Sequence, residues 1–302
     1  MRGATRRVLS KCVLCFRLKP AVSSQMMGNL PEVRVTPSRP FANVGLDYAG
    51  PFNIKVSRNK TGKAYLCVFV CMAVKAVHLE LVSDLTTNAF LNALKRFISR
   101  RGKCLTIMSD NANNSIKWSF IPPYSPHMGG LWEAAVKSAK SHLKTVINET
   151  PLTVEELYTV IVQIESILNS RPLYPLSADI NNLNVLTPGH FLIGTALNSI
   201  LEEDVRDVPV NRTNRFQLLS KMQQSFWQRW STEYVTQLQS RLKWKQKDRS
   251  EYVRVGRMVV IKDDNLPPLR WQLGRITEMH PGADGLTRIV SVPSVQSCRT
   301  VM

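Results

Sequence analysis

The stretch 43–83 decides the fold, and it contains three apolar runs: NVGLDYAGPFNIKV (43–56), AYLCVFVCMAV (64–74) and VHLELVS (77–83). Each run is rich in β-branched and aromatic residues, as strands are. The turn-like segment 57–63 and the short step Lys75-Ala76 separate the runs. The stretch therefore predicts three antiparallel strands in a meander.

A helix is predicted directly after the meander, over TTNAFLNALKRFISRRG (86–102). Thr86 or Thr87 is a suitable N-cap, and Gly102 a suitable end. One face is apolar and carries Phe90, Leu91, Leu94, Phe97 and Ile98. Two short strands are predicted next, in CLTIMSD (104–110) and KWSFIP (117–122). The alternation of strands and helices indicates an α/β fold.

A proline- and glycine-rich loop follows the last of these strands and opens a basic helix that we expect to begin near Leu131. Glu133 stands in its first turn. Helical spacing from Glu133 places three lysines on the same face, namely Lys137, Lys140 and Lys144. Such a face suits a polyanion, and a solvated helix surface is the alternative.

The rest of the chain predicts two more helices and a small β module. Thr153 and Glu156 form a capping-box pattern before an apolar helix that ends between Asn169 and Pro172. Residues 173–214 are loop-rich, and 216–242 have the periodicity of a long amphipathic helix. The strand-length segments after residue 250 predict a small β-barrel.

Composition points to nucleic acid or an anionic surface as the partner. The 302 residues include 40 Lys and Arg against 22 Asp and Glu, a net charge of +18. The absence of a long apolar run or an apolar signal region predicts a soluble intracellular protein without a membrane partner. The length suits two or three domains. Six cysteines are few for this length, so we expect no disulfide framework.

The pair Cys12 and Cys15 lies in a basic N-terminal segment and has the spacing of half a zinc site. Zn²⁺ would need two more ligands, and no histidine precedes His78. A truncated finger or a helix end without metal is the alternative.

Three acids stand where a buried carboxylate is costly: Asp47 inside an apolar strand, Asp110 at a strand end, and Glu133 on the basic helix. If they cluster, a hard cation such as Mg²⁺ or Mn²⁺ would offset their repulsion. Two such metals can clamp the oxygens of a phosphodiester displacement. Taken singly, each acid also fits a turn, cap or helix-dipole role.

Several separate motifs together resemble the integrase region of a retroelement, and most closely that of BEL/Pao-class LTR retrotransposons. They occur in the order of that family and are RPFANVGLDYAGPF (39–52), MSDN (108–111), IPPYSPHMGGLWEAAVKSAK (121–140), LTPGHFLIG (186–194), FWQRWSTEYVTQLQ (226–239) and VVIKDDNLPPLRWQLGRITEMHPGADG (259–285).

The resemblance implies an RNase H-like core, with a mixed five-stranded sheet and helices, followed by a small SH3-like β-barrel. It implies catalytic and metal-ligating roles for Asp47, Asp110 and Glu133, with Mg²⁺ or Mn²⁺ as cofactor. Cys12 and Cys15 match the cysteine half of a zinc finger. Contacts to DNA are implied for Lys137, Lys140, Lys144, His127 and Asn111.

The domains implied are a truncated zinc-finger remnant and linker (1–40), the catalytic core (41–200), a connection with a basic amphipathic helix (201–249) and the barrel (250–302), whose C-terminus departs from the family after Val292. The partners implied are retroelement cDNA ends and target DNA. A homo-oligomer and a nuclear location are expected with them.

The reaction implied is metal-dependent 3′-end processing and strand transfer by a two-metal polynucleotidyl transferase. However, Asp110 and Glu133 stand only 23 positions apart, whereas the family has several tens of residues there. A catalytically inactive remnant that binds nucleic acid is therefore an alternative. An RNA-cleaving relative of the same core is a third.

Overall fold

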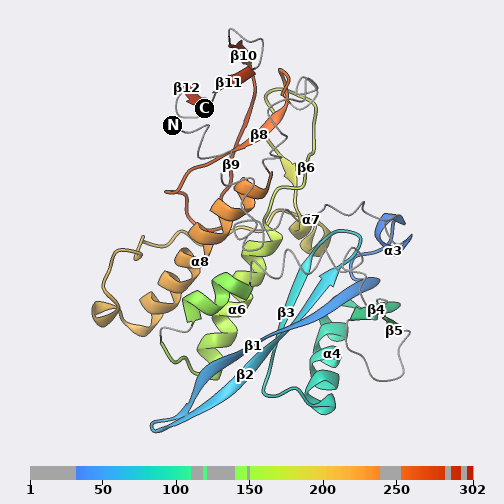
Figure 1. Cartoon of the computed structure of the whole chain (residues 1–302), viewed down its shortest axis with the longest axis vertical. Coiled ribbons are helices and arrows are strands. Elements are labelled where there is room, and N and C mark those ends of the chain that lie inside the picture. The colour runs from blue at the N-terminus through green and yellow to red at the C-terminus, as the bar shows by residue number, and fades with distance from the viewer. Residues whose placement is uncertain are drawn as a thin grey trace, which may run out of the picture.

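A mixed five-stranded sheet lies in the lower part of the molecule as drawn in Figure 1. The structure is a computed structural model that describes residues 32–109, 118–120, 140–147, 150–238, 253–282, 287–293 and 298–301. The sheet order is β3-β2-β1-β4-β5. Its strands are β1 (Asn43–Ser57), β2 (Lys60–Cys71), β3 (Val77–Val82), β4 (Thr106–Ser109) and β5 (Trp118–Phe120).

The pairing of these strands confirms both the meander and the predicted RNase H-like sheet. β1, β2 and β3 pair antiparallel, whereas β4 pairs parallel to β1 and β5 parallel to β4. The parallel step requires a crossover connection, which α4 (Thr87–Arg101) supplies between β3 and β4.

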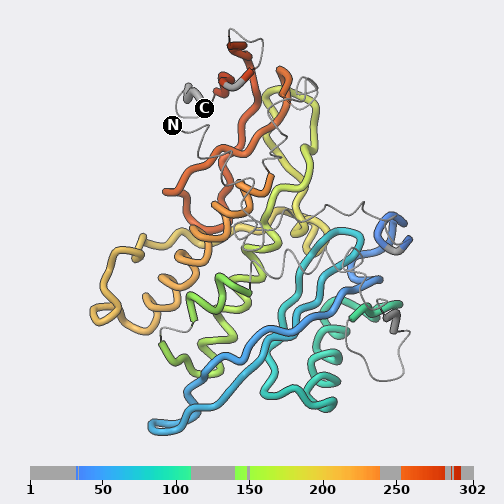
Figure 2. Tube along the Cα trace, viewed as in Figure 1, coloured from blue at the N-terminus to red at the C-terminus, as the bar shows by residue number. Residues whose placement is uncertain are grey.

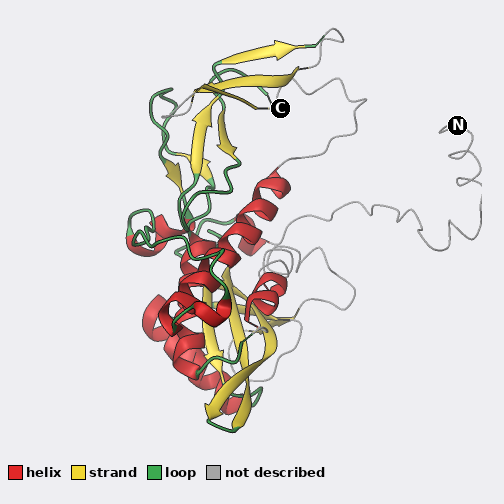
Figure 3. Cartoon of the chain, turned by 90° about the vertical axis from the view of Figure 1, so that its left-hand side faces the viewer, coloured by secondary structure: helices red, strands yellow, loops and turns green. Residues whose placement is uncertain are grey.

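Helices cover both faces of the sheet, as Figures 1 and 3 show. Val44 and Leu46 of β1 pack in a cluster with Leu94 and Phe97 of α4. Ala49 belongs to the opposite cluster, which includes α6 (Val154–Asn169). Because successive residues of a strand point to opposite faces, Asp47 lies on the same face as Ala49.

A bulge in β1 follows Ala49, where the register with β2 shifts before Phe52. Gly50 has φ 128°, and a Cβ there would stand 3.2 Å from the carbonyl oxygen of Ala64. A glycine is therefore needed at this position. The extra residue lets both Ala49 and Phe52 join the core cluster on the α6 face.

The termini predicted for α4 are confirmed, but one of its predicted core residues is wrong. The Thr86 side chain accepts from the Ala89 N–H, and Gly102 ends the helix with φ 85°. Leu91 is 44% exposed. The buried face is centred on Ala93, Leu94 and Phe97, and at 100° per residue Leu91 lies about 110° from that centre, outside the buried face.

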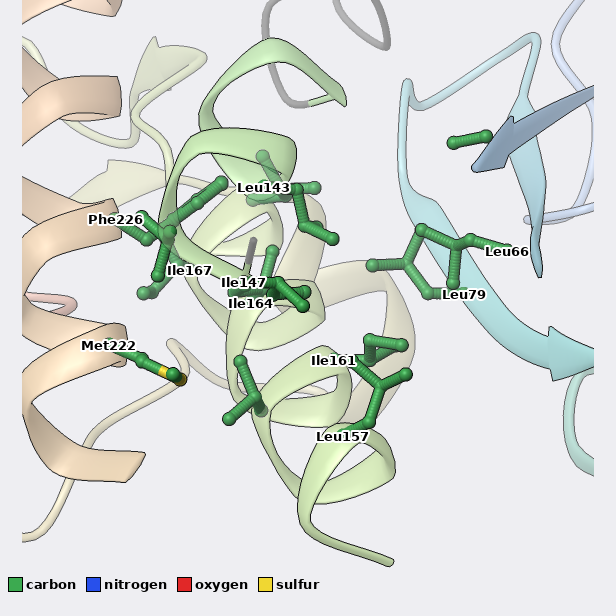
Figure 4. Close-up of a cluster of buried hydrophobic side chains, with 14 of the residues drawn as sticks. Leu66, Leu79, Leu143, Ile147, Leu157, Ile161, Ile164, Ile167, Met222 and Phe226 are labelled. Atoms are coloured by element: carbon green, nitrogen blue, oxygen red, sulfur yellow. The ribbon is translucent and has the colours of Figure 1, made fainter. Parts of the chain in front are cut away.

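The core on the other face joins three helices to the sheet (Figure 4). α6 begins with the predicted capping box, and the apolar residues predicted for its packed face are buried, namely Leu157, Ile161, Ile164, Ile167 and Leu168. α8 (Arg215–Leu238) packs Met222 and Phe226 onto the same cluster. Leu143 and Ile147, from helical residues 140–147, fill the space between α6 and the sheet. Leu238, predicted to share the apolar face of α8, is exposed because the helix has passed the edge of the cluster there.

Shorter elements also occur among the residues that the structure describes. They are α3 (Glu32–Val35), β6 (Tyr174–Pro175), β7 (Val185–Leu186), α7 (Pro188–Ile193) and η1 (Val210–Arg212). The predicted loop-rich character of 173–214 is confirmed. None of the helices described is long and apolar enough to cross a membrane. Three cysteines, Cys67, Cys71 and Cys104, are buried free thiols.

Side chains of α6 protect the edge strand β3. The Asn169 amide accepts from the Val77 N–H (2.8 Å) and donates to the Val77 carbonyl (2.7 Å), as a neighbouring strand would. The Glu165 carboxylate accepts from the Leu79 N–H at 2.8 Å. These bonds satisfy backbone groups that an edge strand otherwise leaves open to another chain.

A buried network of charges ties β3 to both α4 and α6. The His78 ring contacts Glu80 (3.1 Å) and Glu165 (3.3 Å). Arg96 and Arg100 of α4 donate to Glu80 at 2.6 and 2.9 Å. Arg101 donates to Glu165 at 2.6 Å. The two glutamates therefore have partners on every side, which a buried carboxylate requires.

The pKa values of this network follow from these contacts. Burial by itself would lower the pKa of His78, but its hydrogen bonds with Glu165 and Glu80 outweigh burial and raise it. Burial by itself would raise the pKa of Glu80 and of Glu165, but hydrogen bonds with His78, and with Arg96 in the case of Glu80, lower both.

We expect the stabilising contribution of His78 to depend on pH. Because its pKa is raised, protonated His78 stabilises the fold at pH values below its unfolded-state pKa of about 6.5. This stabilisation is lost as the pH rises through the folded-state pKa. The lowered pKa values of the glutamates mean that their contribution, present above about 4.3, is lost at lower pH. The free energy of unfolding should thus differ most between wild type and His78→Gln at about pH 5–6.

Chemical denaturation at a series of pH values checks this expectation. The exposed His280 provides the control, since a His280→Gln variant should change the free energy of unfolding by only a small amount. An effect of His78→Gln that is the same at about pH 5 and at about pH 8, on either side of the usual imidazole pKa, would contradict a charged role for His78.

The C-terminal strands form two small sheets (Figures 1 and 2). β8 (Met258–Ile261) pairs with β9 (Gln272–Arg275), and β11 (Thr287–Pro293) pairs with β10 (Glu278–Pro281) and β12 (Cys298–Val301). The sheets meet at Gly274, where a Cβ would stand 2.3 Å from Val292 Cγ1. The strands agree with an SH3-like module, but the described residues do not close them into one barrel.

Aromatic residues attach this module to the core. Trp271 lies edge-on to Trp227 of α8, with ring centroids 4.8 Å apart. Its indole N–H donates to the Ser170 hydroxyl at 3.2 Å, and Trp227 donates to the Leu266 carbonyl at 3.0 Å. The hairpin β8–β9 is therefore fixed on α8 and on the end of α6.

Candidate functional site

The candidate site is centred on Asp47, in the middle of the sheet. β4 pairs with β1 through Asn43, Val44 and Gly45, and Gly45 stands opposite Met108. The end of β4 thus lies beside the part of β1 that leads into Asp47. The Asp47 side chain is 27% exposed, so it reaches solvent from a central strand.

Both carboxylate oxygens of Asp47 have partners. Oδ1 accepts from the backbone N–H of Tyr48 at 2.6 Å. Oδ2 accepts from Lys140 Nζ at 2.6 Å, an ion pair between residues 93 positions apart in the chain. A cation thus stands against the outer oxygen of this carboxylate.

The groups next to Asp47 on β1 and β2 are uncharged. Burial, together with the neighbouring Cys67, raises the pKa of Tyr48. Burial also raises the pKa of the Cys67 thiol, which lies opposite Tyr48 in the sheet. Both groups remain protonated near neutral pH, and neither is an activated nucleophile.

Buried and paired side chains anchor the helical segment 140–147, of which Lys140 is the first residue. Leu143 and Ile147 are buried in the core. The His142 ring pairs with Glu233 of α8 at 2.5 Å. One turn beyond Lys140, Lys144 is exposed. The backbone of this segment is thus anchored in the core, whereas the Lys140 side chain pairs with Asp47 and Lys144 is exposed to solvent.

The structure brings together two of the predicted site residues, Asp47 and Lys140, and places Lys144 on the adjoining surface. The other predicted residues lie outside the described part of the chain: Cys12, Cys15, Asp110, Asn111, His127, Glu133 and Lys137. Among the described residues, no group of three His, Cys, Asp or Glu side chains could hold a metal ion.

The sequence did not reveal that several basic residues pair with buried glutamates. Arg96, Arg100 and Arg101 were part of the charge that indicated nucleic acid, yet they pair with Glu80 and Glu165. The available signal was that these glutamates interrupt the apolar patterns VHLELVS and QIESIL. A buried acid in such a pattern requires cationic partners.

Comparison with known protein families gives a match for the C-terminal part of the chain. Residues 214–301 match the model of DUF5641, a family of unknown function. This segment comprises α8 and the C-terminal strands. A search of curated proteins finds no match.

Two solved structures of retroviral integrases are similar to the chain. One is the simian T-cell lymphotropic virus intasome in complex with PP2A regulatory subunit B56 gamma, at 16% identity and a TM-score of 0.37, over 100% of this chain and 88% of that chain. The other is the HTLV-2 integrase catalytic core domain in complex with magnesium, at 23% identity and a TM-score of 0.32, over 43% of this chain and 88% of that chain.

At these identities and scores the likeness carries no conclusion about activity. The assignment of an RNase H-like fold rests on the strand order and strand directions described above.

Proposed function

We propose that the chain is the integrase region of a BEL/Pao-class LTR retrotransposon, which binds DNA and carries out metal-dependent 3′-end processing and strand transfer. The six sequence motifs between residues 39 and 285 support the assignment to this family, and the RNase H-like sheet is the scaffold that the resemblance implies for this reaction. A catalytically inactive remnant that binds nucleic acid is the alternative, favoured by the 23-position spacing from Asp110 to Glu133.

The observation that supports this proposal best is the position of Asp47. It stands on the central strand, partly exposed, beside the end of β4. In the sequence, Asp110 directly follows Ser109, the last described residue of β4, and its carboxylate is the second that we propose for this site.

The donor set fits a hard divalent cation. Asp47 offers an oxygen that already attracts the Lys140 ammonium, and Asp110 and Glu133 would supply the other carboxylates. When bound, Mg²⁺ or Mn²⁺ would polarise the phosphodiester and acidify its water. In the protein itself, Asp47 would orient the cation, since its Oδ1 is fixed by the Tyr48 N–H.

The proposed DNA-binding surface begins at the helical segment 140–147. Lys140 and Lys144 would contact phosphates together with Lys137, His127 and Asn111, which sets affinity rather than sequence choice. The C-terminal module, residues 250–302 in the proposed domain division, would contribute a second basic surface. DNA in the nucleus and a further copy of the chain are the proposed partners.

Incubation of the purified full chain with a labelled duplex end and Mn²⁺ or Mg²⁺ tests the proposal. We expect a product shortened at its 3′ end and then joined to a second duplex, and neither product in EDTA. An RNA–DNA hybrid in parallel separates this reaction from RNA cleavage.

DNA retention without any product, at every protein and metal concentration, would instead support the remnant. DNA binding measured at several salt concentrations then tests whether such a remnant binds through the phosphates of DNA. A steep loss of affinity with added salt is expected for a phosphate-binding remnant, and no retention at low salt would contradict both proposals.

A further inference from the structure

We propose that a pocket beside α8 binds a phosphate group. The pocket has a volume of about 70 Å³ and lies between α8, the helical segment 140–147 and Val210 of η1. Thr145 lines it, and at 100° per residue Thr145 is turned about 140° from Lys140 on the same segment. The pocket therefore opens on a different face from the Asp47–Lys140 pair, and the inference does not depend on catalysis at Asp47.

One face of α8 supplies the basic wall of the pocket. Lys221, Ser225 and Arg229 all line it, and their spacing of four residues places them on successive turns of the helix. Leu218 and Met222, which also line the pocket, are 5% and 4% exposed and form its apolar floor. An anion between the two cations would thus meet both charges in a partly desolvated setting, where their attraction is stronger than in open water.

The positive charge at this pocket is not neutralised by described residues. None of the described residues that line it is acidic, and neither Lys221 nor Arg229 forms an ion pair within the part of the chain that the structure describes. Glu233, one turn beyond Arg229 on α8, is paired with His142. These cations therefore differ from Arg96, Arg100 and Arg101, whose charge serves buried glutamates.

The donors at the pocket suit a group with several acceptor oxygens. Lys221 uses one of its three ammonium protons on the Val208 carbonyl, so two remain for a ligand. The Arg229 guanidinium can donate two parallel bonds to a phosphate. The hydroxyl of Ser225 lies between them in sequence and has no hydrogen bond to another described residue. A phosphate group, which offers more oxygens than a carboxylate, matches this set of donors.

Isothermal titration of the full chain with inorganic phosphate, at constant ionic strength, tests the site. We expect the double variant Lys221→Gln/Arg229→Gln to bind phosphate at least about tenfold more weakly than wild type, because two charge-assisted hydrogen bonds are lost. Ser225→Leu fills the pocket without a change of charge and should weaken binding similarly. The matched control, Arg58→Gln/Lys95→Gln, removes two exposed cations outside the pocket and should bind phosphate as wild type does.

A labelled DNA duplex in fluorescence anisotropy then identifies the source of the phosphate group. If a backbone phosphate enters the pocket, inorganic phosphate should compete with DNA, and the slope of log affinity against log salt should fall by about 1 in Lys221→Gln/Arg229→Gln. Unchanged DNA binding, together with weakened binding of inorganic phosphate, supports the same site with the free ion as its ligand.

Three results would overturn the inference: no binding of inorganic phosphate by wild type, equal binding by wild type and Lys221→Gln/Arg229→Gln, or an equal loss in the control double variant. Circular dichroism checks that each variant is folded, and the charge variants decide the outcome if Ser225→Leu does not fold. Absence of DNA processing by a chain that still binds phosphate here would contradict the proposed catalysis alone.

Discussion

Asp47→Asn is expected to lower strand-transfer activity by more than about a hundredfold. Loss of a group that only hydrogen-bonds to a metal ligand already costs roughly 10–100-fold in activity or metal affinity, and Asp47 is itself a proposed ligand. The substitution replaces a carboxylate oxygen with an amide that binds a hard cation weakly. Stability should change little, since the Asp47–Lys140 pair is partly exposed and such pairs contribute about 1 kcal/mol or less. Product formation from labelled DNA and thermal unfolding measure the two effects.

Asp179→Asn provides a matched control for this experiment. Asp179 is exposed, and its Oδ1 accepts from the Asn181 N–H, a bond that an asparagine oxygen also accepts. Its activity should equal that of wild type. An active Asp47→Asn variant would show that Asp47 does not hold the metal, and the proposed mechanism would have to be abandoned.

Glu80→Ala is expected to reduce the free energy of unfolding by about 3 kcal/mol, the lower end of the range for breaking a buried ion pair. The Glu80 side chain has no exposed surface, and it accepts hydrogen bonds from His78, Arg96 and Arg100. The two arginine side chains are 42% and 44% exposed and can turn to water, which limits the loss. His78 is buried and loses this partner outright.

Chemical denaturation followed by far-ultraviolet circular dichroism measures this loss in the sheet. Glu80→Gln keeps a hydrogen-bond acceptor without the charge and should fall between wild type and Glu80→Ala. The exposed Glu202 is the control, with a change within about 0.5 kcal/mol on replacement by alanine. A loss below about 1 kcal/mol for Glu80→Ala would mean that the network adds little to stability.

Local signals in the sequence predicted most elements of the fold. The meander, α4, α6 and α8 are all present close to the predicted positions, because strand composition, caps and apolar periodicity act within a few residues. Predicted burial failed at Leu91 and Leu238. Leu91 lies outside the face of α4 that the sheet covers, and Leu238 lies beyond the edge of the cluster that α8 packs against, so the burial of both depends on the neighbouring elements.

The candidate site was predicted in part. Asp47 was identified because an acid within an apolar strand is unusual, and Lys140 because it shares a helix face with other lysines. Their direct pairing was not predicted, since lysine was expected to contact phosphate. The charge +18 likewise overstated the free basic surface, because Arg96, Arg100 and Arg101 serve Glu80 and Glu165.

By itself, the sequence determined which segments of this protein become strands and helices, and which carboxylates are candidates for chemistry. Only the tertiary structure decided the partners of those charges: Lys140 for Asp47, and α6 side chains for the edge of β3. The physical reason is one of range. Caps and periodicity depend on neighbours along the chain, whereas an ion pair between residues 47 and 140 exists only after packing brings separate elements together.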